Sequence, residues 1–262
     1  MSLSSKSSAS AEILALSVVL IASTIAAATD SGAIQQTPSS TDYYDTAPEI
    51  VVGFVGGFIH RDDERRSEVQ LAQRLRAAYG KNVFAAVFEN HHKKKAYRAI
   101  LEMLDANHDG VLSPLEKHNA RIVLYGHSWG GSTVVSLAQD LQRDGVPVLL
   151  TVQVDSISRF RAKDSVIPAN VARAVNFYQT HGLIHGQPKI VAADSARTKI
   201  IGNYRMDYKK PPEECRVYPW YDHHWIKGHE AIECDPQLWS QVEGLIRGQL
   251  AAHPAENLAK SR

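Results

Sequence analysis

From residue 49 onward, short apolar runs alternate with stretches in which apolar residues recur every three or four positions. The apolar runs predict strands at 49–58, 82–90, 120–126 and 146–155. The periodic stretches predict helices at 67–80, 94–105 and 131–145. Because this alternation forms right-handed crossovers, we predict an α/β fold: a doubly wound, mostly parallel sheet with helices on both faces.

The later part of the chain continues the pattern less regularly. After residue 155 comes a long connection, in which IPANVARAVNFYQ (167–179) has helical spacing and Pro168 suits a first turn. The run TKIIGNYRM (198–206) is strand-like, and the stretch 235–246 predicts a last helix. We expect the long connection to lie over the carboxyl ends of the strands, where it would shape a pocket.

Composition narrows the class of protein. With 262 residues, 44% of them hydrophobic, the chain is long enough to bury the core of one full-sized domain. A formal net charge of +1 provides no long-range field for nucleic acid or an anionic membrane. We therefore expect a small-molecule or lipid partner and no nucleic acid.

The N-terminus has the features of an export signal. Lys6 precedes the apolar stretch 13–28, which ends in small residues and is followed by a polar segment. This pattern predicts a signal peptide at 1–28, a flexible leader at 29–48, a folded domain at 49–252 and a tail at 253–262. We thus expect a periplasmic or extracellular protein without a membrane span after cleavage. The alternative is an uncleaved membrane anchor, although the stretch is shorter than the ~20 residues that span a bilayer.

The two cysteines, Cys215 and Cys234, both lie in the last fifth of the chain. Export to an oxidising compartment would allow them to form a disulfide, and two buried thiols are the alternative.

The motif GHSWGG (126–131) follows an apolar strand and opens a helix. In that context G-x-S-x-G forms a sharp turn that presents the serine above the sheet, and the glycines make room for it. The helix N-terminus adds a positive field for a developing oxyanion. Ser128 is therefore the candidate nucleophile; the alternative is that it only caps the helix.

With this motif in this order of elements, the chain resembles the α/β-hydrolase superfamily of serine esterases and lipases from about residue 49 to 250. The resemblance implies an acid and then a histidine after Ser128. Asp155, at the end of the strand after the nucleophile, is the expected acid, and Asp207 is the alternative. The expected base is His229, in a closing loop before the last helix; His223 and His224 remain alternatives.

An oxyanion hole needs two backbone donors. The resemblance implies Trp129, directly after the nucleophile, and Gly57 or Phe58, in the glycine-containing loop after the first strand. The expected activity is hydrolysis of a carboxylic ester through an acyl-enzyme. A thioesterase and a catalytically inactive calcium-binding or interaction module remain open.

A second motif lies in the connection before the nucleophile strand. In DANHDGVLSPLE (105–116), the residue types match an EF-hand-type calcium loop, with Gly110 at the sharp turn and Leu112 directed inward. The candidate ligands are Asp105, Asn107, Asp109, Val111, Ser113 and Glu116. We expect bound Ca²⁺ to stabilise this connection without entering the chemistry. The alternative is an ordinary polar connection, since EF-hands usually occur in pairs and this chain has one loop.

Overall fold

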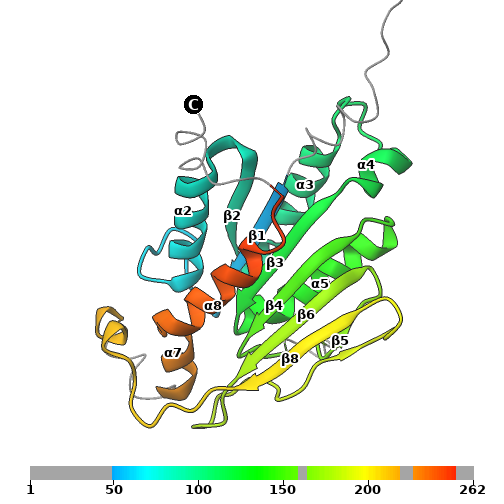
Figure 1. Cartoon of the computed structure of the whole chain (residues 1–262). Coiled ribbons are helices and arrows are strands. Elements are labelled where there is room, and N and C mark those ends of the chain that lie inside the picture. Colours follow the sequence, from blue (N-terminus) through cyan, green and yellow to red (C-terminus); the bar gives the residue numbers. More distant parts are fainter. Residues whose placement is uncertain (1–48, 159–163, 219–226, 252–262) are drawn as a thin grey trace, which may run out of the picture. The chain divides into compact units, whose positions relative to one another are not determined.

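The computed structural model describes residues 49–158, 164–218 and 227–251. Its centre is a sheet of six strands in the order β2-β1-β3-β4-β6-β8, and every neighbouring pair is parallel (Figure 1). The strands are β1 (Glu49–Val55), β2 (Val83–Glu89), β3 (Arg121–His127), β4 (Val148–Val154), β6 (Val171–Tyr178) and β8 (Lys199–Arg205). Two short strands, β5 (Val166–Ile167) and β7 (Val191–Ala192), form a separate parallel pair.

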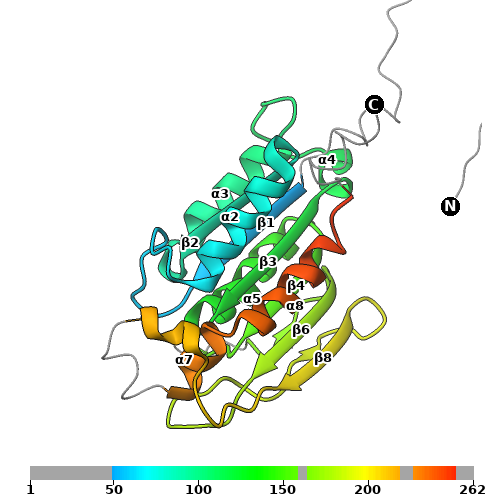
Figure 2. The same ribbon diagram turned by 60° about the vertical axis from the view of Figure 1, so that its left-hand side comes forward.

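Helices cover both faces of this sheet. The helices α2 (Ser67–Tyr79) and α8 (Pro236–Arg247) pack on one face, and α3 (Lys93–Leu104) and α5 (Trp129–Arg143) pack on the other (Figures 1 and 2). Shorter helical segments are η1 (Gly80–Asn82), η2 (Asn90–His92), α4 (Pro114–His118), η3 (Glu213–Val217) and α7 (Lys227–Glu233). The prediction of a doubly wound α/β domain is confirmed.

The two hydrophobic cores explain why the strands read as continuous apolar runs. In β3, Ile122 and Leu124 pack under α3 and α5, while Val123 and Tyr125 pack under α2 and α8. All four are fully buried. Because alternate side chains of a strand point to opposite faces, a sheet covered on both sides needs apolar residues at every position.

The prediction of a helix at 167–179 is wrong. Residues 171–178 form β6, which lies between β4 and β8. Pro168 lies in a turn, where its carbonyl accepts a hydrogen bond from the backbone N–H of Val171. A strand buried on both faces places apolar residues at many spacings, including helical ones, so the spacing of apolar residues did not separate the two structures.

Cys215 in η3 and Cys234, directly after α7, form a disulfide with their Cα atoms 5.3 Å apart. The bond ties the end of α7 to a segment nineteen residues earlier in the chain. In the described part of the chain, no helix combines the length and the apolar character needed to cross a membrane.

Candidate active site

Ser128 lies at the turn between β3 and α5 with φ 57° and ψ −126°. A positive φ is strained for a residue with a side chain, and the surrounding packing must hold it. The neighbouring glycines show how tight this packing is: a Cβ on Gly130 would overlap the backbone of Phe54 in β1, and a Cβ on Gly126 would overlap Gly130. The spacing of the motif is therefore a steric requirement.

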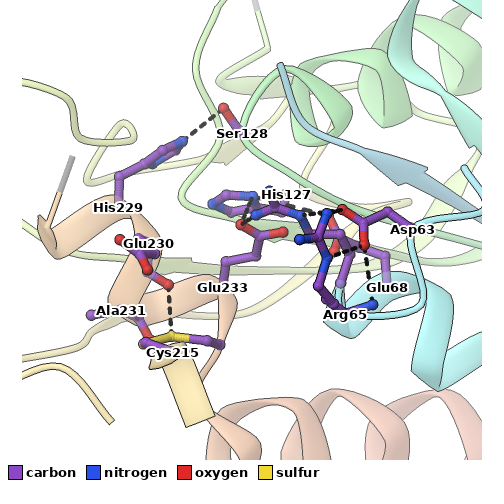
Figure 3. A network of polar contacts seen from close by, with 12 residues as sticks. Asp63, Arg65, Glu68, His127, Ser128, Cys215, His229, Glu230, Ala231 and Glu233 are labelled. Carbon is purple, nitrogen blue, oxygen red and sulfur yellow. Dashed lines mark hydrogen bonds and ion pairs between the residues drawn. A yellow bond between two sulfur atoms is a disulfide. The ribbon is translucent and has the colours of Figure 1, made fainter. Parts of the chain in front are cut away.

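Three of the predicted site residues are joined by hydrogen bonds. Nε2 of His229 lies 2.8 Å from Oγ of Ser128, and Nδ1 of His229 lies 2.7 Å from Oδ2 of Asp155. All three side chains are buried. They come from the end of β3, the end of β4 and helix α7, so the fold joins residues 128, 155 and 229 at the carboxyl edge of the sheet. Ser128 and His229 face each other in Figure 3.

Asp155 is fixed by donors on both of its oxygens. Oδ1 accepts from the backbone N–H groups of Gly186, at 2.7 Å, and Gln179, at 3.2 Å. Oδ2 accepts from Nε2 of Gln179, at 2.7 Å, in addition to the imidazole of His229. A Cβ on Gly186 would overlap the backbone of Asp155. The carboxylate therefore has one orientation, directed at His229. Neither Gln179 nor Gly186 was singled out from the sequence, because nothing in their local pattern indicates a contact with Asp155.

The alternatives from the sequence have different positions. Asp207 is exposed and pairs with the exposed His181, at 2.6 Å, so it does not contact His229. His223 and His224 lie outside the described residues. The expected closing loop is partly wrong: His229 lies in the short helix α7, and two residues separate the end of α7 from the start of α8. Residues 227–233 contain only two strongly apolar side chains, so apolar spacing gave little indication of this helix.

A cavity of 840 Å³ opens beside Ser128 and His229. Trp129, Gly57 and Phe58, the predicted oxyanion donors, all line it. The ring of Phe58 is 95% exposed and meets the ring of Trp129 edge-on, with centroids 5.3 Å apart. The loop after β1 is held by η2, because Nδ2 of Asn90 donates to the carbonyl of Gly57 at 2.6 Å. Ile157, directly after β4, and Ile184, between β6 and β7, also line the cavity. Both lie in the segment after residue 155 that was expected to shape a pocket, although β6 divides that segment.

Next to His229 lies a buried polar cluster that the sequence did not indicate (Figure 3). It consists of Glu68 at the start of α2, His127 at the end of β3 and Glu233 at the end of α7. The rings of His127 and His229 lie 4.4 Å apart. Burial, together with the nearby Glu233 carboxylate, raises the pKa of Glu68 well above its ordinary value. Burial also lowers the pKa of His127 well below its ordinary value. Both side chains are therefore held in an environment that disfavours their charged forms.

The predicted calcium loop adopts part of the expected conformation. Gly110 has a φ of 81°, which suits the sharp turn at the sixth position, and Leu112 packs against the core. The carboxylate of Asp105 accepts hydrogen bonds from the N–H groups of Asp109 and Gly110. The carboxylate of Glu116 accepts from Ala106 and Ser113.

These backbone donors lower the pKa of Glu116, the bond from Ser113 most strongly. The loop is thus closed by its own side chains. In residues 49–158, 164–218 and 227–251, one group of three acidic and histidine side chains has its ligand atoms within 4.8 Å of one another, and it is the cluster Glu68, His127 and Glu233. The carboxylates of the loop are not brought together in that way. The loop lies beside α4, at the end of the sheet opposite α7 (Figures 1 and 2).

Comparison with solved structures gave similar folds at low identity. A lipase B from Aspergillus fumigatus is 11% identical, with a TM-score of 0.44 over 83% of this chain and 56% of that one. A thioesterase, RedJ, from the prodiginine biosynthetic pathway of Streptomyces coelicolor is 12% identical, with a TM-score of 0.40 over 79% of this chain and 92% of that one. A thermostable esterase from Pseudomonas putida is 11% identical, with a TM-score of 0.37 over 77% of this chain and 72% of that one.

No family model matches the chain, and no curated protein matches it. Similarity at this level carries no argument about function.

Proposed function

We propose that this protein is a serine hydrolase that cleaves carboxylic esters with Ser128, His229 and Asp155 as its catalytic triad. The observation that supports the proposal is the unbroken chain of hydrogen bonds from Asp155 through His229 to Ser128. Each link lies within 2.6–3.2 Å, the range that general base catalysis requires. The strained backbone of Ser128 is a second support, because such strain persists where the surroundings enforce it and occurs often at active sites.

The roles follow from the geometry. Oγ of Ser128 attacks the ester carbonyl carbon while Nε2 of His229 accepts the hydroxyl proton. The tetrahedral intermediate collapses, the carbon–oxygen bond to the alcohol breaks, and His229 returns the proton to the leaving oxygen. Water then attacks the acyl-enzyme by the same route, which releases the acid and restores the Ser128 hydroxyl. Asp155 stays ionised, orients the imidazole and stabilises the imidazolium.

The oxyanion of each tetrahedral intermediate needs donors beside Ser128. We assign this role to the backbone N–H of Trp129 and that of Gly57 or Phe58, which line the same cavity. Trp129 is also the first residue of α5, so the helix N-terminus faces the developing charge.

Turnover of an ester series tests the assignment. The parent protein, Ser128→Ala, His229→Ala and Ser132→Ala would be assayed on p-nitrophenyl esters from acetyl to palmitoyl, and on an acyl thioester. Ser132 is the matched control, since it is buried one turn further along α5. We expect both triad substitutions to lower kcat by at least about 10³-fold and Ser132→Ala to leave it unchanged.

A serine-directed fluorophosphonate gives an independent readout. It should label Ser128 in the parent and in Ser132→Ala, and it should not label Ser128→Ala. A parent that neither reacts with this probe nor turns over any ester or thioester would falsify the proposal, and an inactive binding module would then take its place.

We also propose that the loop 105–116 binds Ca²⁺ in a structural role. The turn at Gly110 and the inward position of Leu112 support this, as does the set of oxygen donors, which is the type that Ca²⁺ takes. The bound ion would fix the entrance to β3, the strand whose other end carries Ser128.

Thermal unfolding with Ca²⁺ and with a calcium-selective chelator tests this role. Isolated extracellular sites bind with affinities of about 10⁻⁴–10⁻³ M, so about 10 mM Ca²⁺ should raise the Tm of the parent by several degrees. Asp109→Ala should abolish the shift, while Asp144→Ala, outside the loop, should retain it. An unchanged Tm in the parent would rule the site out.

We propose, finally, that the enzyme is exported, on the basis of the pattern in residues 1–28 and of the disulfide. N-terminal sequencing of protein released from expressing cells tests this. A new N-terminus near residue 29 is expected, and recovery of the intact chain from the cytosol alone would contradict export.

A further inference from the structure

Beside the triad, three buried side chains from separate elements converge on one point (Figure 3). Nδ1 of His127 lies 3.9 Å from Oε1 of Glu68 and 3.8 Å from Oε2 of Glu233. The three side chains are 2%, 0% and 3% exposed, respectively. These separations are too long for hydrogen bonds, yet the three groups face one another with their polar atoms.

Two members of the cluster have polar atoms that the fold leaves unsatisfied. Both carboxylate oxygens of Glu68 and both ring nitrogens of His127 lack a hydrogen bond of normal geometry within the residues that the structure describes. The Glu68 carboxylate has only a weak contact with its own backbone N–H, and the His127 ring has only a weak contact with the backbone of His229. A buried polar group without a partner costs roughly 1–3 kcal/mol, and a charged one costs more. A fold does not usually retain such groups side by side unless a ligand satisfies them.

Near the cluster, Arg66 supplies positive charge to the carboxylate of Glu233. Nη1 of Arg66 lies 3.0 Å from Oε2 of Glu233, and the guanidinium also contacts Asp63 at 3.3 Å. The positive charge of Arg66 acts to lower the pKa of Glu68, but the two side chains form no ion pair, and the ring nitrogen that faces the Glu68 carboxylate is Nδ1 of His127. Among the described residues, no Lys or Arg side chain therefore pairs directly with this carboxylate.

The cavity beside Ser128 gives access to this place. His127 and Glu233 line it, together with Ser128 and His229. A small ion can therefore reach the cluster by the route that the substrate would take, and one coordination position would face the cavity.

We propose that Glu68, His127 and Glu233 bind a divalent transition-metal ion of the zinc type. One imidazole nitrogen and two carboxylate oxygens are ligands that Zn²⁺ accepts, at about 2.0–2.2 Å. A tetrahedral ion at those distances separates its ligand atoms by about 3.3–3.6 Å. The observed His127–Glu68 and His127–Glu233 separations of 3.9 and 3.8 Å therefore require a closure of a few tenths of an ångström. The ligand atoms of all three side chains lie within 4.8 Å of one another, and rotation of the two glutamate side chains would bring them to the metal.

The donor set also distinguishes this site from the loop 105–116. Ca²⁺ and Mg²⁺ prefer oxygen ligands alone, whereas imidazole suits zinc and its neighbours in the first transition series. Three protein ligands with a fourth position open to the cavity is the arrangement of an ion that takes water or a substrate oxygen as its last ligand.

Direct metal binding tests the site without relying on hydrolysis. The Ser128→Ala protein would be stripped with a chelator and titrated with Zn²⁺ by calorimetry, with the metal content then measured by mass spectrometry. Glu68→Gln, Glu68→Met and His127→Gln would be compared in the same background. Glu89→Gln is the matched control, since Glu89 is also a buried glutamate at the carboxyl end of the sheet.

We expect one zinc ion per chain, binding at least about tenfold weaker in each ligand variant and unchanged binding in the control. No binding by the parent, or equal binding in all the variants, would overturn the proposal.

A spectroscopic measurement on protein that retains Glu68, His127 and Glu233 tests the site even if a ligand variant does not fold. X-ray absorption of the zinc-loaded parent should show imidazole scattering in a shell of nitrogen and oxygen ligands. A shell without imidazole would place the ion elsewhere and refute the assignment. Because binding is measured in Ser128→Ala, failure here and failure of the ester assignment are separate results.

Discussion

His127 and His229 lie ring against ring, but the fold treats them differently. Both nitrogens of His229 are hydrogen-bonded, one to Asp155 and the other to Ser128. Both nitrogens of His127 have no such partner in the described chain, and its two acidic neighbours lie at 3.8 and 3.9 Å. The first arrangement is complete without a ligand. In the second, the acidic neighbours lie beyond hydrogen-bonding distance, at separations that a bound ion would shorten by a few tenths of an ångström. These distances distinguish the hydrogen-bonded triad from the cluster that we propose binds an ion.

The largest expected effect comes from removing the carboxylate of Asp155, which accepts the hydrogen bond from His229. Asp155→Asn keeps the size of the side chain, but it replaces one oxygen with an amide nitrogen that cannot accept a hydrogen bond from Nδ1–H of His229. We expect kcat on the best ester to fall by about 10³–10⁴-fold with the fold retained. Asp207→Asn, on the exposed pair with His181, is the control and should change kcat by less than about twofold. A loss of less than about tenfold in Asp155→Asn would count against the triad.

The second effect concerns α7, the helix that carries His229, whereas His127 lies in β3. The disulfide Cys215–Cys234 closes a loop of nineteen residues at the end of α7. Its removal by a double substitution to alanine should lower the free energy of unfolding by about 3 kcal/mol, as loop-closure entropy predicts. Urea unfolding of the two proteins measures this. Esterase activity should fall in parallel at temperatures near the new Tm, because α7 positions one half of the His229–Ser128 contact.

The third effect compares the two carboxylates of the metal cluster in chelator-treated protein. Glu68→Met removes an unsatisfied buried carboxyl, so the free energy of unfolding should rise by about 1–3 kcal/mol. Glu233→Met should lower it by about 2 kcal/mol, because the buried Arg66 loses an ion pair. If the two substitutions change the free energy of unfolding in urea with opposite signs, the description of Glu68 as a carboxylate without an ion pair is supported. Equal signs would contradict it.

The smallest effect involves Glu89, a buried glutamate that has partners. Burial raises its pKa, but the bond from His92 and backbone donors, Arg61 among them, outweigh burial and lower it to about 2. A depressed pKa gives stability that is present above the ordinary value of 4.5 and is lost as the pH falls toward 2.

Glu89→Gln should therefore cost about 1–2 kcal/mol at pH 7, and the gap to the parent should narrow below pH 4.5. Urea unfolding between pH 7 and 3 measures this gap. A gap that is independent of pH would remove the electrostatic explanation.

Much of the fold was predictable because the signals were local. The strands of the first half, the nucleophile turn and the last helix all have apolar patterns or glycines whose physical reasons act within a few residues. The prediction of a helix at 167–179 failed because β6 has buried residues on both faces. Its apolar residues therefore do not show the alternation that distinguishes a strand from a helix.

The site was predictable only as far as each residue stood at the end of a recognisable element. Ser128, Asp155 and His229 were identified in this way, and the structure joins them by hydrogen bonds. Glu68 and Glu233 were not identified, since an acid in the first turn of a helix and another at the end of a short one are ordinary surface patterns. Only the packing of α2 and α7 around β3 shows that these two acids are buried together.

At the rim of the cavity, stabilisation of the oxyanion and contact with the substrate depend on different parts of the same residues. Phe58 and Trp129 are candidates to stabilise the oxyanion through backbone N–H groups, while their rings meet at the mouth of the cavity. The side chain of Phe58 is almost fully exposed, so it can be replaced without moving the main chain beneath it. Substrate preference can then be diversified at Phe58 by mutation while the proposed oxyanion donors stay in place, which makes this part of the rim a suitable region for directed evolution.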